Sequence, residues 1–308
     1  MSRFLSLRIN EGRVGVVGEV IGDIGWEGFL RFDMREPEFR VLSEIYRRVG
    51  DSRVVVVLGL AAGIVDFQLG PGGAPRFWNT LLQTVSRRGF KLGSLNDVRE
   101  AVFDFLKEPI NARFRKTKYS RIEKFFSSDF AQYLWSKGLD YLAENPKEVW
   151  YRLAGALNNR PQQKTIVFAM KVLDLITLIV KGHYAKFPPN VSIPLDMHVA
   201  RMALTSGIVE YHWTGKLAST IVEELMSRNP QVFRSAWAEV SRHVSEKIGK
   251  HISLLRLDSL VWQIGRKAYE THYIRTLAKQ KIKRYLIEEV KIDPQIAEKI
   301  ADTFTYRM

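Results

Sequence analysis

The stretch RPQQKTIVFAMKVLDL, residues 160–175, begins with an arginine, a proline and two glutamines and continues as an apolar segment. Residues 163–180 are apolar on nearly every helical face, which is typical of a helix at the centre of a fold. Two lysines, Lys164 and Lys171, nevertheless interrupt it, with Phe168 between them. Because a buried helix face rarely carries ammonium groups, these amines are candidates for chemistry. The residues alone leave the alternative that both lysines reach past the core into solvent.

Pro161 predicts where this helix begins. Proline suits the first turn of a helix, because the N–H that it lacks would have no partner there. Lys164 should therefore lie among the unpaired N–H groups of the first turn. These groups oppose a further positive charge and favour an uncharged, nucleophilic amine. Lys171 follows seven residues later on the same face and acts in the same direction.

The segments on either side have the apolar period of amphipathic helices. Residues 36–50 form one such helix, which ends at Gly50. Further helices are expected at 77–85, 128–145, 146–157, 196–207, 215–227, 229–248, 256–269, 273–290 and 293–304. The run VVVVLGLAAGIV at 54–65 starts with β-branched residues and is compatible with helix or strand. Without sustained strand alternation or an internal repeat, the sequence predicts an all-α fold.

The composition indicates size and compartment. The chain has 308 residues, 46% of them hydrophobic, which is enough for one large domain or two interlocked ones. It has no cysteine, so disulfides and cysteine metal sites are excluded and a reducing, cytoplasmic compartment is the natural one. The N-terminus lacks the apolar core of a signal peptide, and the longest apolar run is too short to cross a bilayer. We expect an intracellular protein with no membrane partner.

The charge predicts a polyanionic partner. Lys and Arg number 47 against 33 Asp and Glu, a formal net charge of +14, which favours nucleic acid. The excess gathers in residues 86–93, 111–126 and 278–286. In the second cluster cations alternate with aromatic residues, a mixture suited to phosphates and unstacked bases, although a solvated helix face is the alternative for any single cluster. The candidate DNA ligands are Arg87, Arg88, Arg113, Arg115, Lys116 and Lys118.

Several other chemistries lack their residue patterns in this sequence. The six histidines have no metal-ligand spacing, so no metal site is expected. Neither a GxxxxGKS/T loop nor a GxSxG elbow occurs, which argues against nucleotide hydrolysis and serine-hydrolase chemistry. We expect no cofactor.

Residues 146–163 are an expected helix followed by the polar turn NNRPQQ, and the next helix opens on a lysine. This arrangement resembles the helix-hairpin-helix DNA glycosylases. Five segments in order resemble more closely the archaeal 8-oxoguanine DNA glycosylase family, AGOG: EPEFRVLSEIYRRVGDSR, the loop leading to RFW, RPQQKTIVFAMKVL, IPLDMHVARMAL and LDSLVWQIGR. The resemblance implies one catalytic unit over 1–308, made of two interlocked helical subdomains with a cleft between them. Their approximate bounds are 1–90 plus 190–308, and 91–189.

The resemblance also implies roles for individual residues. Lys164 matches the lysine that forms a Schiff base with C1′ of the nucleoside, and Asp196 matches the catalytic aspartate. Phe168 and Trp262 match the aromatic pair that sandwiches the turned-out base. From the residues alone, Asp196 is a helix N-cap and Trp262 a core side chain.

Four further residues match positions around the base. Lys171 and Asp258 match polar groups that hold its edge, and Trp78 matches a tryptophan of the pocket. From the residues alone, Asp258 is a first-turn acid favoured by the helix dipole. Glu38 stands where the resemblance leads us to expect a glutamine that contacts the base.

The implied function is excision of 8-oxoguanine from DNA, followed by β-elimination that nicks the strand. Such a protein is a bifunctional DNA N-glycosylase and AP lyase, acting as a monomer on double-stranded DNA, with single strands as a further substrate. Two alternatives remain at this point: a related glycosylase for another damaged base, and a basic helical protein that binds nucleic acid without catalysis.

Overall fold

α-Helices make up nearly all of the secondary structure. The computed structural model describes residues 7–211 and 218–308. The only strands in these ranges are β1 (Leu7–Ile9) and β2 (Val209–Tyr211), which pair antiparallel. The predicted all-α class is confirmed. None of the described helices is both long and apolar enough to cross a membrane.

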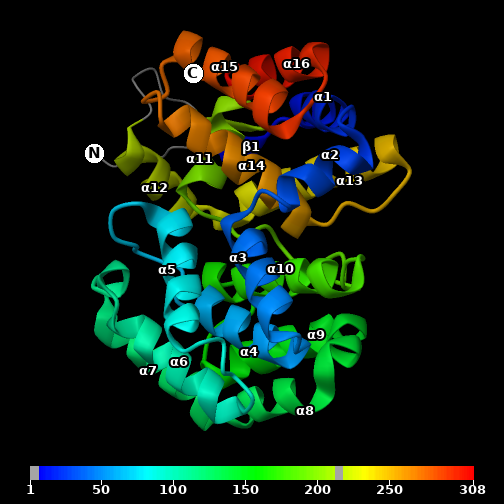
Figure 1. The fold of residues 1–308 in the computed structure, drawn as a ribbon. Coiled ribbons are helices and arrows are strands. Elements are labelled where there is room, and N and C mark those ends of the chain that lie inside the picture. Colours follow the sequence, from blue (N-terminus) through cyan, green and yellow to red (C-terminus); the bar gives the residue numbers. More distant parts are fainter. Residues whose placement is uncertain (1–6, 212–217) are drawn as a thin grey trace. The chain divides into compact units, whose positions relative to one another are not determined.

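The chain divides into two compact units. The first unit comprises Met1–Asp33 and Ser192–Met308, and the second unit is Met34–Val191. The elements of the second unit are α3 (Pro37–Val49), α4 (Ser52–Gly63), α5 (Gly73–Arg87), α6 (Leu95–Lys107), the 3-10 turn η1 (Pro109–Asn111), α7 (Arg115–Ser127), α8 (Asp129–Glu144), α9 (Pro146–Ala156) and α10 (Lys164–Lys181). As predicted, α10 is the central helix: it packs against α3, α4, α8 and α9 (Figure 1).

The run of valines forms α4, so the segment that was compatible with helix or strand is a helix. The Asp51 side chain caps it by accepting a hydrogen bond from the N–H of Arg53 at 2.8 Å. Every residue from 54 to 63 is buried. A Cβ on Gly59 would lie 2.7 Å from Ile176 Cδ1, so this glycine permits the close approach of α4 to α10. Burial on all sides explains why the run shows no helical period.

The observed units group one segment differently from the predicted subdomains. The sequence placed residues 34–90 with the two chain ends, whereas α3, α4 and α5 lie in the second unit. The reason is packing: α3 and α4 contact α10, and α5 contacts α3 and α6. The apolar faces of these helices are therefore buried against the segment that follows them in the chain.

The start of α10 also differs slightly from its prediction. Pro161 lies in the turn before the helix rather than in its first turn, and the helix begins at Lys164 with Gln163 as N-cap. The carbonyl of Pro161 accepts a hydrogen bond from Trp150 Nε1 at 2.8 Å, which ties this turn to α9. Lys164 is thus the first residue of the helix, as expected.

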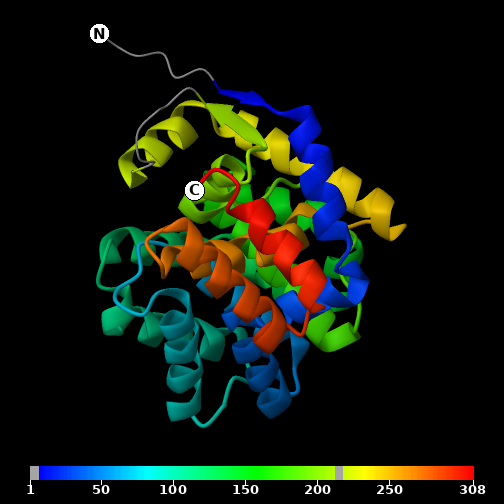
Figure 2. The ribbon, with the colours of Figure 1, turned by 90° about the horizontal axis from the view of Figure 1, so that it is seen from above.

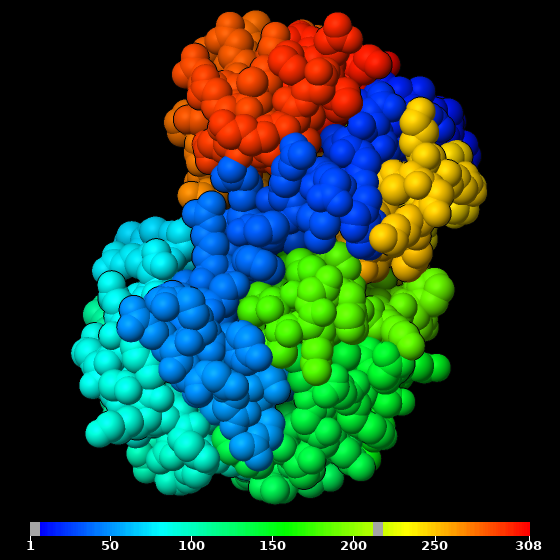
Figure 3. Space-filling model, turned by 45° about the vertical axis from the view of Figure 1, so that its right-hand side comes forward, coloured from blue at the N-terminus to red at the C-terminus, as the bar shows by residue number. Residues whose placement is uncertain are grey.

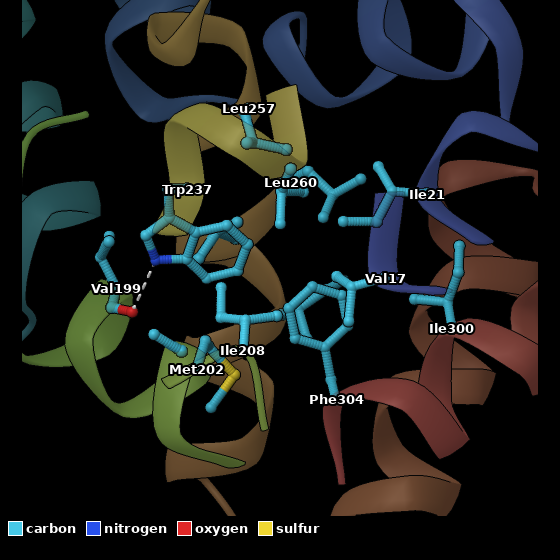
Figure 4. Packing of buried hydrophobic residues seen from close by; sticks show 14 of the residues in the cluster. Val17, Ile21, Val199, Met202, Ile208, Trp237, Leu257, Leu260, Ile300 and Phe304 are labelled. Atoms are coloured by element: carbon cyan, nitrogen blue, oxygen red, sulfur yellow. Dashed lines mark hydrogen bonds between the residues drawn. The ribbon is translucent and has the colours of Figure 1, made fainter. Parts of the chain in front are cut away.

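The first unit surrounds an apolar core (Figure 4). Its elements are β1, α1 (Glu11–Gly22), α2 (Gly25–Asp33), α11 (Met197–Thr205), β2, α12 (Ser219–Arg228), α13 (Pro230–Ile248), α14 (Leu254–Tyr269), α15 (Arg275–Arg284), the π-helical turn η2 (Tyr285–Val290) and α16 (Pro294–Phe304). The rings of Trp237 and Phe304 stack at 6.4 Å, and Trp237 Nε1 donates to the carbonyl of Val199 at 3.2 Å. Figure 2 shows α16 beside α1 and α15, which it contacts.

Most predicted helices are present within a few residues of their expected bounds. The helix expected at 273–290 is interrupted, because α15 passes into η2 at Tyr285. Part of the helix expected at 215–227 lies outside the described residues, and its described part is α12. The helices α1, α2, α6 and α7 were not predicted.

Candidate active site

Two amines flank one aromatic ring on α10. Lys164 Nζ lies 5.7 Å from the centroid of the Phe168 ring, and Lys171 Nζ lies 5.9 Å from the same centroid. Lys164 and Phe168 are half-buried, whereas Lys171 is only 2% exposed. The spacing of four and seven residues places all three on one face of the helix, as the sequence predicts. The aromatic ring and the amine of Lys164 thus remain partly accessible above a buried second amine.

The buried amine of Lys171 faces two carboxyl groups at the start of α3. Its Nζ lies 3.4 Å from Glu36 Oε2 and 3.8 Å from Glu38 Oε1. In Figure 3 the α3 segment runs across the second unit between α5 and the α10 region, both of which α3 contacts. Glu38 and Lys171, which the resemblance assigns to the surroundings of the base, thus lie near each other, and Glu36 is a neighbour that the sequence did not identify.

Glu38 has an unusual environment for a carboxyl group. It is 1% exposed, and neither Oε1 nor Oε2 has a hydrogen-bond partner. Burial raises the pKa of Glu38 well above its ordinary value, the nearby Glu36 raises it further, and Lys171 opposes the shift. A neutral carboxylic acid offers one donor and one acceptor, as an amide does. Glu38 thus keeps hydrogen-bonding capacity that the described protein does not use.

Asp66 is a third buried carboxyl near the amines, and the sequence did not identify it. Trp78 Nε1 donates a hydrogen bond to Asp66 Oδ2 at 2.9 Å. Burial raises the pKa of Asp66, while the positive charges of Lys164, Lys118 and Lys171 lower it. Lys164 therefore interacts electrostatically with this acid. The only feature of the sequence that could have indicated a buried acid here is that Asp66 directly follows the apolar run at 54–65.

Trp78 is buried, so its ring does not present an open face. Its indole N–H is engaged by Asp66, and its ring meets Phe77 edge-on at 5.6 Å. Trp78 is thus too deeply buried to contact a base directly, as the resemblance implied that it would. The side chain instead donates a hydrogen bond to the acid that interacts electrostatically with Lys164.

Lys118 is misplaced in the predicted set of DNA ligands. It is 0% exposed, its Nζ donates to Asn111 Oδ1 at 3.1 Å, and it lies 5.3 Å from the ring of Phe67. Burial lowers the pKa of Lys118 to about 8, and Asp66 opposes this shift. Because α7 turns this residue inward, its amine is unavailable to a phosphate and serves the packing between α7 and the loop after α4.

The other predicted cations lie on the surface, in two settings. Arg87 pairs with Glu108, and Arg88 pairs with Glu100 at 2.6 Å and with Asp104. Arg113, Arg115 and Lys116 are exposed around the start of α7. Within the described residues, these last three form no ion pair with a carboxylate, so they are the stronger candidates for phosphate contacts.

The first unit holds the other predicted site residues. Asp196 is the N-cap of α11: its Oδ1 accepts hydrogen bonds from the N–H groups of His198 at 2.9 Å and Val199 at 3.0 Å. The capping role expected from the residues alone is thus present. Both bonds use one oxygen of the carboxylate.

Asp258 and Trp262 lie one turn apart on α14. Asp258 is buried, and Trp262 is half-buried with its ring edge-on to His198 at 6.3 Å. Helices α11 and α14 pack so closely that a Cβ on Gly265 would lie 3.1 Å from His198 Cβ. The aspartate cap and the tryptophan are therefore held on two firmly packed neighbouring helices.

Most of the chain is similar to proteins of known family. The sequence profile of the AGOG family, described as N-glycosylase/DNA lyase, matches residues 18–300. The chain is 24% identical to the N-glycosylase/DNA lyase of Pyrobaculum aerophilum, over 83% of this chain and 87% of the relative, and 24% identical to that of Aeropyrum pernix, over 85% of each. Among solved structures, the 8-oxoguanosine complex of the P. aerophilum 8-oxoguanine DNA glycosylase has a similar fold, with a TM-score of 0.64 and 20% identity, covering 88% of this chain and 96% of that one.

Proposed function

The chain belongs to the AGOG family of N-glycosylase/DNA lyases, and from this premise we propose that it excises 8-oxoguanine through a Schiff base on Lys164. It is accordingly a DNA repair enzyme that cleaves N-glycosidic bonds and nicks the strand as a lyase. What we propose is which damaged base the enzyme removes and which residues carry out the reaction. The observation that carries it is the half-buried Lys164 at the first position of α10, beside an accessible aromatic ring.

Lys164 supplies the nucleophile. Its Nζ bonds to C1′ while the bond from C1′ to the base breaks, and that electron pair leaves with the base, which takes up a proton. The sugar then opens to an imine, whose positive charge acidifies the C2′ proton. Loss of this proton expels the 3′ phosphate and nicks the strand.

The carboxylate of Asp196 is the proposed proton acceptor. Asp196 accepts the proton that Lys164 must lose and stabilises the positive charge that grows on the sugar. Its fixed position as the cap of α11 restricts its rotation, so its carboxylate is preorganised. In this proposal the two units act as one catalytic unit.

Base recognition uses the aromatic and polar residues around α3, α10 and α14. Phe168 and Trp262 are each half-buried, so each retains a ring surface for stacking on a turned-out base. Lys171, Glu38 and Asp258 hold the polar edge of the base. The oxidised purine differs from guanine by its N7–H donor and its O8 oxygen, and an acceptor aimed at N7–H would be left unpaired by guanine.

The duplex backbone is held by Arg113, Arg115 and Lys116. Turning a nucleotide out of a duplex costs a few kcal/mol, and phosphate contacts on either side hold the strand while this occurs. The substrate in this proposal is double-stranded DNA, bound by one copy of the protein inside the cell. Arg87 and Arg88 are secondary contributors because they are already paired with acids.

Borohydride trapping tests the proposal. Wild-type protein should form a covalent adduct with a duplex that carries 8-oxoguanine, and Lys164→Gln should abolish it. Lys181→Gln, at the last residue of the same helix, is the matched control and should trap normally. Absence of an adduct with the wild type, or its persistence in Lys164→Gln, would contradict the assignment.

A different damaged base is the second candidate, and Glu38 is the observation that favours it. A carboxyl group where an amide is expected alters which hydrogen bonds the site can donate. A panel of duplexes with oxidised, alkylated and deaminated bases separates the two candidates by the rate of strand nicking.

A further inference from the structure

Asp66 is a buried acid to which the proposed reaction gives no role. It follows the end of α4, it is 7% exposed, and its Oδ2 accepts a hydrogen bond from the indole of Trp78. A carboxyl group buried in this way loses its hydration and needs other groups to compensate for that loss. A hydrogen bond from a neutral donor supplies part of the compensation, and the charges around Asp66 supply the rest.

A single guanidinium joins the segment before Asp66 to the first turn of α10. Arg121 Nη1, on α7, donates to the carbonyl of Ile64 at 2.9 Å and to Thr165 Oγ1 at 2.8 Å. Ile64 lies two residues before Asp66, and Thr165 directly follows Lys164. Because one nitrogen holds both segments, the acid and the proposed nucleophile belong to backbone segments that meet at Arg121.

The packing of α4 on α10 keeps these segments in place. Gly63 ends α4, and a Cβ there would lie 3.2 Å from the Cα of Ala169. That is closer than ordinary van der Waals contact, so the glycine permits this approach. Phe67 directly follows Asp66, and the guanidinium of Arg121 lies 4.9 Å from the centroid of its ring. The chain is thus anchored on both sides of Asp66.

Charged groups on three helices act on Asp66. Burial raises the pKa of Asp66, and Lys164 on α10 is the neighbouring charge that opposes this shift most strongly. Lys118 on α7 and Lys171 on α10 act in the same direction as Lys164. Glu38 on α3 is a buried acid that also interacts with Asp66. The ionised carboxylate is therefore stabilised chiefly by the amine of the proposed nucleophile.

Asp66 and Phe168 each interact favourably with the ammonium form of Lys164. An electrostatic interaction is mutual, so the carboxylate that Lys164 stabilises also stabilises the charged amine. The amine lies 5.7 Å from the centroid of the Phe168 ring, within the range in which a ring attracts a cation. Lys171, 5.9 Å from the same ring, opposes a second charge there. Removing the charge of Asp66 would weaken the ammonium form of Lys164 while leaving the ring in place.

We propose that Asp66 is a positioning residue that holds the resting amine of Lys164 as an ammonium ion and so sets the pH above which the enzyme forms its imine. This inference rests on the proposed function, in which Lys164 is the nucleophile. Before attack the ammonium loses one proton to its acceptor, Asp196 in the proposed function, and the N–H electron pair stays on nitrogen. An anion that stabilises the ammonium form moves this loss to higher pH.

The pH dependence of imine formation tests this role. A duplex with a preformed AP site needs no base excision, so single-turnover trapping with cyanoborohydride reports the imine step alone. Asp66→Asn keeps an acceptor for Trp78 but removes the charge. Its half-maximal pH for trapping should be about 1 pH unit lower than that of the wild type, so that trapping well below this midpoint is roughly 10-fold faster. A merely structural role would lower the maximal rate and leave the half-maximal pH unchanged.

Two substitutions are matched controls. Asp66→Glu keeps the charge and should keep the half-maximal pH of the wild type. Asp51→Asn, at the N-cap of α4, removes an equal charge at the other end of the same helix, keeps a capping side chain and should behave as the wild type does. If Asp66→Asn does not fold, Asp66→Ser takes its place, because its hydroxyl also accepts from the indole.

The results separate two failures. If Lys164→Gln abolishes the adduct, an unchanged or higher half-maximal pH in Asp66→Asn would overturn the role of Asp66 alone. If the adduct persists in Lys164→Gln, the nucleophile is another residue, and the proposed function and the role of Asp66 are both overturned.

Discussion

Trp78 donates its indole N–H to Asp66 Oδ2 over 2.9 Å, and both side chains are buried. The acid in turn interacts electrostatically with Lys164. The tryptophan that the resemblance assigns to the base pocket therefore holds a buried carboxyl group that interacts electrostatically with the proposed nucleophile.

Trp78→Phe should lower the free energy of unfolding by roughly 1–3 kcal/mol, because Asp66 loses its donor in a buried site. Urea denaturation measures this change. In an Asp66→Leu background, which has no acceptor for the indole N–H, the same substitution should cost less, and the difference is the coupling between the two side chains. Equal costs in both backgrounds would show that Trp78 acts through packing alone.

Glu38 makes the stability of the protein depend on pH. Burial, and next the nearby Glu36, raises the pKa of Glu38 above its ordinary value of 4.5; Lys171 opposes this, and Asp66 adds to it weakly. The folded protein keeps a proton that the unfolded chain releases above about pH 4.5. The free energy of unfolding therefore falls as pH rises from 4.5 toward the raised pKa, by at most about 1.4 kcal/mol per pH unit.

Glu38→Gln should remove this dependence, since an amide does not titrate. The variant should match the wild type near pH 4.5 and become progressively more stable than it at higher pH, measured by urea denaturation. Glu44→Gln, on the same helix, is the control with opposite sign. Hydrogen bonds from Arg47 and Arg48 lower the pKa of Glu44 to about 2, so the stability it contributes is present above pH 4.5 and is lost toward pH 2. A constant difference between Glu38→Gln and wild type across this range would refute the protonated state.

The helix α10 and its two amines were predictable because their signal is local: an apolar helix interrupted by lysines at positions 164 and 171. The role of Asp66 was not predictable from the sequence, because it depends on interactions with Trp78 and Lys164 that form only in the folded protein. Lys118 was assigned to the surface because a charge cluster does not indicate which cation turns inward. Its spacing with Ile122 and Phe125, which form the buried face of α7, is the signal that could have corrected this.

Substitution of Lys118 should change the stability of the protein, whereas substitution of Lys116 should change its affinity for DNA. Lys118→Ala leaves Asn111 Oδ1 without its donor in a buried site, so the free energy of unfolding should fall by roughly 1–3 kcal/mol. Lys116→Ala should leave stability unchanged, weaken DNA binding and reduce the slope of log affinity against log salt by about 1. Urea denaturation and binding titrations at several salt concentrations measure both effects. A lower salt slope in Lys118→Ala with normal stability would return it to the set of DNA ligands.

Phe168 and Trp262 should be needed for binding and excising the damaged base, and not for binding undamaged duplex DNA. Each keeps a partly accessible ring, and loss of one base–aromatic contact corresponds to about 1–3 kcal/mol, or roughly 5- to 150-fold. Phe168→Ala and Trp262→Ala should therefore weaken binding and excision of 8-oxoguanine by this factor, with affinity for undamaged duplex within about 2-fold of wild type. The control is Arg113→Ala, which should weaken both duplexes alike because a phosphate contact carries no information about the base. If the two aromatic substitutions reduce affinity for damaged and undamaged DNA equally, their rings support the fold rather than the base, and the stacking assignment fails.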